Sequence, residues 1–210
     1  MARKRIDVLL VERGLFQSRS QARQAIEAGG VTVSGLPLSK PSEQVDEHAE
    51  IAAAPAHGWV GRGALKLVHA LECWAITPQA KVVLDIGAST GGFTQVCLEG
   101  GARRVFAVDV GRGQLHPRIA SDPRVINLEG LDARSLDRDV IDEAPDLIVC
   151  DASFIGLEKV LPAAMGLAAL GADLIALVKP QFQLGPGRVG KGGIVKDPQA
   201  RLVALAGVEA

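Results

Sequence analysis

The chain has few aromatic residues and few cysteines. Its 210 residues include no tyrosine, two tryptophans, five phenylalanines and three cysteines. Cys73, Cys97 and Cys150 are widely spaced without a Cys-x-x-Cys pair, which argues against a disulfide framework or a zinc site. All three are simply explained as small apolar core residues. We therefore predict a cytoplasmic protein that requires no metal.

The sequence also lacks an excess of charge of one sign and an unbroken apolar run. A net charge of −1 excludes a protein that coats nucleic acid over its whole surface, so such a partner must bind a local patch. Residues 160–178 are interrupted by Pro162 and Asp173, which favours a helix, a turn and a buried strand over a membrane span. The start, residues 1–14, is unlike a signal peptide because Glu12 breaks its apolar run. We expect no membrane partner.

The apolar content of 48% is ample for a core, and the first quarter of the chain has a pattern of its own. Two short amphipathic helices are predicted within residues 5–14 and 18–30, with Ser18 as the N-cap of the second. Residues 31–39 alternate and turn at Ser34-Gly35, as a hairpin does. These elements predict a small α+β domain over residues 1–53.

Charge is segregated within this region. Residues 1–26 carry six Lys/Arg against two acids, whereas residues 27–51 carry one Lys against five acids. On the second predicted helix, Arg19 and Arg23 are four residues apart and share one face. A nucleic-acid patch and an ordinary solvated surface both explain this face.

The run "SRSQARQAIEAGGVTVSG", together with the order of elements around it, resembles an S4 domain, a small RNA-binding module. The resemblance implies that Arg5, Arg19 and Arg23 lie toward RNA phosphates. The Ala/Pro/Gly-rich stretch that follows is interpreted as a linker, over residues 54–61.

Beyond the linker, over residues 62–210, apolar strand patterns alternate with helical or loop sequence. Strands are predicted within residues 81–87, 104–111, 124–130, 146–153 and 173–181. This alternation predicts an α/β fold, a doubly wound Rossmann-like domain with a parallel sheet.

The stretch "VVLDIGASTGGFTQ", residues 82–95, predicts a buried strand, a tight turn and a helix start. Gly87, Gly91 and Gly92 let the main chain approach a ligand at the helix N-terminus. The turn matches neither the dinucleotide pattern nor a P-loop. The pattern therefore indicates a nucleotide-type cofactor of another kind.

Three carboxylates follow three successive predicted strands. Asp85 would repel a pyrophosphate but balances a cation, and S-adenosylmethionine carries a sulfonium and an ammonium without phosphate. Asp109 can hold ribose hydroxyls, and Asp132 can accept from the adenine amino group. Each Asp alone is better explained as a helix cap or turn residue. Three aspartates at one edge of a sheet favour their interpretation as cofactor-binding residues.

Six motifs occur in order behind the S4-like region: "GRGALKL", "DIGASTGGFT", "VDVGRGQL", "DASFIGL", "LVKPQF" and "GKGGIVKDP". Together they resemble the haemolysin-A (TlyA) family of ribosomal RNA 2′-O-methyltransferases, relatives of the FtsJ-type enzymes. The resemblance implies a class I methyltransferase domain that uses S-adenosylmethionine to methylate a ribose, that of cytidine, in ribosomal RNA of a ribosomal subunit, and we expect a monomer. The expected cofactor contacts are Asp85, Gly87, Ser89, Thr90, Gly91, Gly92, Phe93, Asp109 and Asp132.

The family also implies a Lys-Asp-Lys-Glu catalytic set, of which Lys66, Asp151 and Lys179 match. A ribose hydroxyl must be oriented and must lose its proton during attack, which is the role expected of Lys179. Lys66 would supply a second cation that steadies the developing oxyanion, and Asp151 would position a lysine and the methyl donor. For Lys66, a place on a solvated helix face is the alternative.

Two further residues are candidates for RNA contacts. Phe154, in a Gly-containing loop after Asp151, can stack on a base turned out of the RNA, although a core position explains it as well. Arg62, beside two glycines, can hold a phosphate, and the alternative is an ordinary surface arginine.

The sequence departs from the family pattern near its end. Glu209 lies in a helix-like run, residues 198–210, and not in a strand, so we leave the fourth catalytic role unassigned. We expect a truncated methyltransferase domain with apolar surface exposed around residues 173–178. Gln183 and Arg112 replace an acid and an aromatic residue that are usual in the family.

Two other functions compete with the methyltransferase interpretation. A non-catalytic RNA-binding protein on a truncated methyltransferase scaffold is the first. A membrane-lysing protein, suggested by the family's historical name, is the second, and the lack of a span or of a strongly amphipathic basic helix argues against it.

Overall fold

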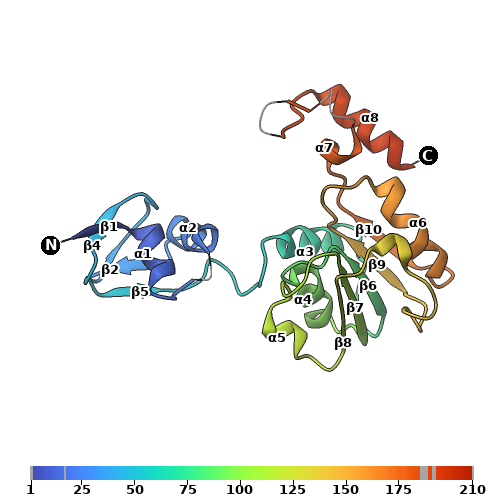
Figure 1. The fold of residues 1–210 in the computed structure, drawn as a ribbon, viewed down its shortest axis with the longest axis horizontal. Helices are drawn as coiled ribbons and strands as arrows, with labels where there is room; N and C mark the ends of the chain where they lie inside the picture. Colours follow the sequence, from blue (N-terminus) through green and yellow to red (C-terminus); the bar gives the residue numbers. More distant parts are fainter. Residues whose placement is uncertain (1, 17, 185–188, 191–192, 210) are drawn as a thin grey trace. The chain divides into compact units, whose positions relative to one another are not determined.

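The computed structural model describes residues 2–16, 18–184, 189–190 and 193–209 (Figure 1). The chain divides into two compact units, Met1–Gly58 and Trp59–Ala210. The boundary between them falls inside the linker predicted over residues 54–61.

In its described residues, the first unit contains two short helices and five short strands. The helices are α1 (Ile6–Glu12) and α2 (Arg19–Glu27), and their apolar faces share a core with Val31 and Val45. The strands are β1 (Arg3–Arg5), β2 (Val31–Val33), β3 (Leu36–Pro37), β4 (Gln44–Asp46) and β5 (Ile51–Ala53). Strands β1 and β4 form an antiparallel pair, and β2 lies between β3 and β5 in a second antiparallel sheet.

The local signals in this unit act as predicted. The Ser18 hydroxyl accepts a hydrogen bond from the Gln21 amide at 3.3 Å and begins α2. Ser34 and Gly35 both have positive φ angles, 50° and 78°, and connect β2 to β3. That is the turn geometry that keeps the twist of a two-residue hairpin. The helix and hairpin predictions for this region are confirmed.

The second unit is built on five parallel strands in the order β10-β9-β6-β7-β8. Their bounds are β6 (Val82–Ile86), β7 (Arg104–Asp109), β8 (Val125–Glu129), β9 (Leu147–Cys150) and β10 (Asp173–Ala176). Each lies within a predicted segment, and the order reverses between β6 and β9. The doubly wound fold is therefore confirmed, and its switch point lies at the end of β6.

Both faces of this sheet are covered by helices. Val83 and Val105 pack on the face covered by α3 (Gly63–Cys73), α4 (Gly92–Glu99) and α5 (Pro117–Ala120). Their neighbours Val82 and Phe106 pack on the other face with α6 (Leu157–Leu167) and the 3₁₀ turn η1 (Ala133–Ser135). Figure 1 shows α3 and α4 on one side of the sheet and α6 on the other. This alternation explains why every residue of β6 is buried.

Strand β10 forms one edge of the sheet. Leu174 on this strand is 41% exposed, whereas Ile175 is buried. The chain continues through α7 (Pro180–Gln183) and α8 (Pro198–Glu209), and α8 packs against α7 and α6. The helix expected near the end is confirmed, although the side chain of Glu209 lies outside the described residues. No helix in the described part of the chain is long and apolar enough to cross a membrane.

Candidate active site

Two adjoining cavities open at the carboxyl ends of the strands. The first has a volume of about 580 Å³ and combines apolar walls such as Ile86 and Leu131 with polar groups. The second, about 730 Å³, is lined by residues of α3, of the turn after β6 and of the segments after β9 and β10, with the basic side chains of Arg62, Lys66 and Lys179 among them. Both cavities are bordered by Gly87, Ser89, Asp151 and Ser153. The two cavities therefore meet at these four residues.

The turn after β6 requires glycine at two positions. Gly87 has a φ of 79°, and a Cβ there would lie 2.9 Å from the main chain of Ala152. Gly91 has a φ of 92°, and a Cβ would lie 2.8 Å from the Leu115 side chain. Any larger residue would combine a strained backbone with a clash. The turn is thus fixed against β9 on one side and the loop after β7 on the other.

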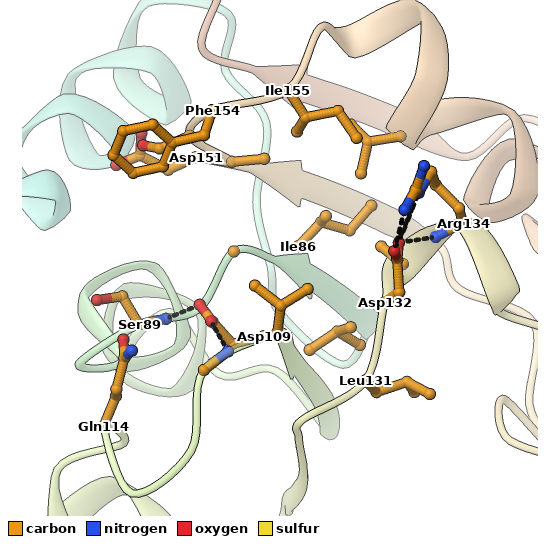
Figure 2. A pocket seen from close by; sticks show the side chains of 18 residues that line it. Ile86, Ser89, Asp109, Gln114, Leu131, Asp132, Arg134, Asp151, Phe154 and Ile155 are labelled. Atoms are coloured by element: carbon orange, nitrogen blue, oxygen red, sulfur yellow. Dashed lines mark hydrogen bonds and ion pairs between the residues drawn. The ribbon is translucent and has the colours of Figure 1, made fainter.

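Asp109 joins two turns at the wall of the first cavity. Its carboxylate accepts hydrogen bonds from the Ser89 amide at 2.8 Å and from the Gly111 amide at 2.7 Å (Figure 2). A carboxylate can accept about four hydrogen bonds, so two sites remain beyond these main-chain contacts. Asp109 therefore combines a structural role with a position at the cavity.

Asp132 also lines the first cavity, opposite Asp109. Its carboxylate caps η1 through the Arg134 amide at 2.9 Å and pairs with the Arg134 guanidinium at 2.5 Å. The guanidinium lowers the pKa of Asp132 to about 2. Figure 2 shows Ile86 between the side chains of Asp109 and Asp132. Asp132 therefore both caps η1 and lines the first cavity.

Asp85 is absent from the described linings of both cavities. Its side chain is completely buried, and Oδ2 accepts a hydrogen bond from the Thr94 hydroxyl at 2.6 Å. Oδ1 has no hydrogen-bond partner among the described residues. Burial raises the pKa of Asp85 to about 7, against a smaller opposing effect of the Thr94 bond. Asp85 can therefore influence a ligand in these cavities only through the electric field of its carboxylate and not by direct contact.

Not all predicted cofactor residues border the first cavity. Gly87 and Ser89 border both cavities, while Thr90, Gly92 and Phe93 border the second. Phe93 is 3% exposed and belongs mainly to the core under α3 and α4. Gly91 contacts Leu115 and is absent from the described linings of both cavities.

The predicted catalytic residues Lys66, Asp151 and Lys179 all line the second cavity. The Lys179 ammonium lies 2.6 Å from Asp151 Oδ1 and donates to the Ser153 hydroxyl at 2.7 Å and to the Asp151 carbonyl at 3.0 Å. The ammonium thus makes two hydrogen bonds and one ion pair, and Asp151 Oδ1 itself accepts no hydrogen bond among the described residues. Lys66 projects from α3 and is exposed. Arg62, the residue before α3, borders the same cavity.

Phe154 is the most exposed phenylalanine of the site. Its side chain is 89% exposed and its φ is 66°, a conformation that costs energy for a residue other than glycine. Its ring lies 5.1 Å from that of Phe182, at a tilt of 44°. Phe154 borders the first cavity beside Asp151 (Figure 2). The core position that the sequence also allowed is thus wrong.

Gln114 and Glu129 form part of the site and were not predicted. Gln114 borders the first cavity. The Glu129 carboxylate accepts from the Gln114 amide at 2.6 Å and the Leu115 amide at 2.9 Å, and these bonds lower the pKa of Glu129 to about 2. An acid at the end of the third strand, beside a Gly-rich loop, is the only sequence signal for this contact. It fixes the loop that carries Gln114.

The arginines predicted for RNA binding lie in the first unit. Arg5 and Arg19 both pair with the buried carboxylate of Asp7, which the sequence analysis did not single out. Arg23 is exposed on α2, and its side chain makes no ion pair or hydrogen bond with another described residue. Asp7 is completely buried, and its arginine partners lower its pKa to about 2. No cluster of three or more potential metal ligands occurs among the described residues of either unit.

Comparison with known proteins gives a family match for each of the two units. Residues 4–51 match the S4 domain, and residues 59–209 match the FtsJ-like methyltransferase family. The 16S/23S rRNA (cytidine-2′-O)-methyltransferase TlyA of Mycobacterium tuberculosis is 49% identical over 211 residues, which cover 99% of this chain and 79% of the relative.

YqxC of Bacillus subtilis is 42% identical over 206 residues, covering 97% of this chain and 73% of YqxC. The solved structure of a protein from Streptococcus thermophilus that carries the name hemolysin matches with a TM-score of 0.74 at 38% identity. The match covers 99% of this chain and 77% of the other. The chain therefore belongs to the FtsJ-like methyltransferase family and, within it, to the proteins related to TlyA that carry an S4 domain.

Proposed function

We propose that this chain transfers a methyl group from S-adenosylmethionine to the ribose 2′-hydroxyl of a cytidine in ribosomal RNA. The observation that carries the proposal is the junction of the two cavities at Asp151 and Ser153. Methyl transfer requires donor and acceptor in line at contact distance, and two cavities with a common border offer adjoining places for them. The printed name of the TlyA relative supports this reaction and this substrate.

The first cavity fits the methyl donor. Ile86 and Leu131 offer apolar surface to an adenine ring, and Asp132 offers a carboxylate to its amino group. The two acceptor sites left on Asp109 suit ribose hydroxyls. The main chain of the Gly87 turn, which excludes a Cβ, suits the amino-acid end of the donor. When bound, S-adenosylmethionine supplies an electrophilic methyl group on a cationic sulfur.

The second cavity supplies the groups that activate the acceptor hydroxyl. Lys66 stabilises negative charge that develops on the attacking oxygen. Lys179 takes the hydroxyl proton during attack, and the Asp151 carboxylate, 2.6 Å from the Lys179 nitrogen, positions this lysine. Ser153 holds the Lys179 nitrogen at the border of the two cavities.

The RNA is held by groups at the cavities and in the S4 unit. Arg62 binds a phosphate next to the acceptor nucleotide, and Phe154 stacks on its base, with Phe182 behind the Phe154 ring. Strain at a highly exposed aromatic residue is typical of a functional position. In the S4 unit, Arg5, Arg19 and Arg23 bind phosphates further along the RNA.

The proposal is tested by measuring transfer of labelled methyl groups to purified ribosomal subunits. Replacing Lys179 by Met should reduce transfer by about 10³-fold and leave calorimetric affinity for S-adenosylmethionine within a few-fold of the original. Lys159→Met, an exposed lysine on α6, is the matched control and should retain full activity. Donor binding without any methylation of ribosomal RNA would instead support a non-catalytic RNA-binding protein. Leakage of liposomes by the chain would support membrane lysis.

A further inference from the structure

Asp7 is the one carboxylate in the first unit that is completely buried, among the residues that the structure describes. It lies in the first turn of α1, and its two partners come from different elements. Arg5 ends β1, and Arg19 is the first residue of α2. The carboxylate therefore ties together the starts of both helices of the unit.

The contacts are directional. Arg5 donates through Nε and Nη2 to the two oxygens of Asp7, both at 3.0 Å, and Arg19 donates through Nη2 to Oδ2 at 2.8 Å. A two-pronged contact of this kind fixes the plane of a guanidinium as well as its position. The Arg5 and Arg19 side chains remain 42% and 56% exposed, so their outer edges face solvent while their inner edges bind Asp7.

Other basic residues of the unit are used differently. Arg13 donates to the carbonyl oxygens of Glu47 and Ala49, and Lys4 pairs with the exposed Glu12 at 2.8 Å. The contacts of Arg13 join two chain segments, and the pair of Lys4 with Glu12 lies on the surface. Neither contact brings two arginines to one carboxylate. Among the described ion pairs of this unit, only the group of Asp7, Arg5 and Arg19, which we call the Asp7 cluster, brings two arginines to one carboxylate.

We propose that Asp7 is a positioning residue for RNA recognition, which holds Arg5 and Arg19 as a preformed two-arginine clamp for backbone phosphates. The inference rests on the proposed RNA-binding function of the first unit. Two free arginine side chains would each lose considerable rotamer freedom on binding phosphate, whereas arginines already fixed by Asp7 lose less. With two cations and one anion, the cluster keeps a net positive charge.

For the change in RNA affinity on replacing Asp7, the proposal predicts the opposite sign from the one that net charge alone predicts. Replacing Asp7 by Asn adds one unit of positive charge next to the binding surface, which should tighten RNA binding if Asp7 had no positioning role. If Asp7 positions the clamp, the same change weakens binding although the charge becomes more favourable. Glu12→Gln is the matched control, because it also removes an acid from α1 but affects only Lys4, which keeps Glu47 at 3.9 Å.

The test measures fluorescence anisotropy of the full chain with a labelled RNA hairpin over a range of salt concentrations. We expect Asp7→Asn to weaken binding about tenfold, the size of one charge-assisted hydrogen bond. The slope of log K against log salt should fall by about one. Glu12→Gln should bind as tightly as the original chain or slightly more so. Binding by Asp7→Asn that is unchanged or tighter would overturn the proposal.

A second pair of variants covers the case in which Asp7→Asn does not fold. Arg5→Lys and Arg19→Lys keep every charge but lose the planar fork that Asp7 holds, so each should weaken binding at constant net charge. Equal affinity and an equal salt slope in both would also overturn the proposal. Charge reversal of Arg19 and Arg23 to Glu tests RNA binding by this unit itself. If that double variant binds RNA normally, the proposed function of the unit fails, whatever Asp7 does.

Discussion

Each unit of the chain buries one aspartate completely, and the two are treated in opposite ways. Asp7 in the first unit meets two guanidinium groups, which lower its pKa to about 2. Asp85 in the second unit meets one hydroxyl and leaves one oxygen without a described partner, and burial raises its pKa to about 7. Burial alone therefore does not decide the charge of a carboxylate; its partners do.

The surroundings of the two aspartates explain why Asp7 has arginine partners and Asp85 has none among the described residues. Asp7 lies near a surface at which cations are exposed, so arginines reach it while keeping their outer edges in solvent. Asp85 lies under the turn after β6, with Asp109 and Asp151 close enough to raise its pKa further. A bound cationic ligand above that turn would stabilise the charged form of Asp85. The comparison predicts that the contributions of Asp7 and Asp85 to the free energy of unfolding change with pH in opposite directions.

The largest expected effect is on the second unit. Because the pKa of Asp85 is raised from 3.8 to about 7, the folded state keeps a proton that the unfolded chain has lost between these pH values. The free energy of unfolding should therefore fall as pH rises from about 4 to about 7, by up to roughly 4 kcal/mol. Asp85→Asn should remove this dependence. Calorimetry of the chain at a series of pH values measures it.

The control for this experiment is Asp109→Asn, since Asp109 is a partly exposed carboxylate at the neighbouring strand end. That variant should keep the fall in stability with rising pH. A pH dependence that survives in Asp85→Asn would show that some other group is responsible, and the contrast between the two buried aspartates would then fail.

A smaller effect of opposite sign is expected in the first unit. The lowered pKa of Asp7 gives stability that is fully present above about pH 4 and is lost as pH falls through about 2. Asp7→Asn should lower the free energy of unfolding at neutral pH by about 1 to 2 kcal/mol, a range reduced because the two arginines are half exposed. Urea unfolding followed at neutral pH and near pH 2 checks this. Equal losses at both pH values would contradict the ionic explanation.

The sequence predicted the parts of the fold that depend on local patterns. The five parallel strands are continuous apolar runs, because both faces of their sheet are covered. Strands β1, β4 and β5 were not predicted, because each has only three residues and, unlike β2 and β3, no tight turn joins it to its partner. They are fixed by pairing with distant segments. For the same reason the contacts of Asp7 with Arg5 and Arg19 could not be found from spacing alone.

For the candidate site, the sequence identified residue types and the correct edge of the sheet but not the direction of each side chain. Asp85 and Ile86 are adjacent, yet Ile86 borders the first cavity while Asp85 points to α4, because neighbours on a strand face opposite sides. The support of the loop after β7 by Glu129 also depends on how two strands pair. The catalytic roles of Lys66, Asp151 and Lys179 stay predictions that rest on their shared cavity and on the family resemblance.

The smallest effect sharpens the comparison by removing the only side-chain donor that Asp85 has among the described hydrogen bonds. The Thr94 hydroxyl donates to Asp85 at 2.6 Å and partly offsets the effect of burial on its pKa. Thr94→Val keeps the side-chain shape but removes this donor, so the pKa of Asp85 should rise further. The midpoint of the pH dependence of unfolding should move upward by about one unit, which corresponds to roughly 1.4 kcal/mol.

Thr90→Val is the matched control, since Thr90 lies in the same turn at the second cavity and has no contact with Asp85 among the described hydrogen bonds. It should leave the midpoint unchanged. If Thr94→Val also leaves it unchanged, the hydroxyl does not stabilise the charged form, and solvent or the main chain must do so. If the midpoint moves upward as expected, the difference between Asp7 and Asp85 reduces to the number and charge of the donors that each carboxylate meets.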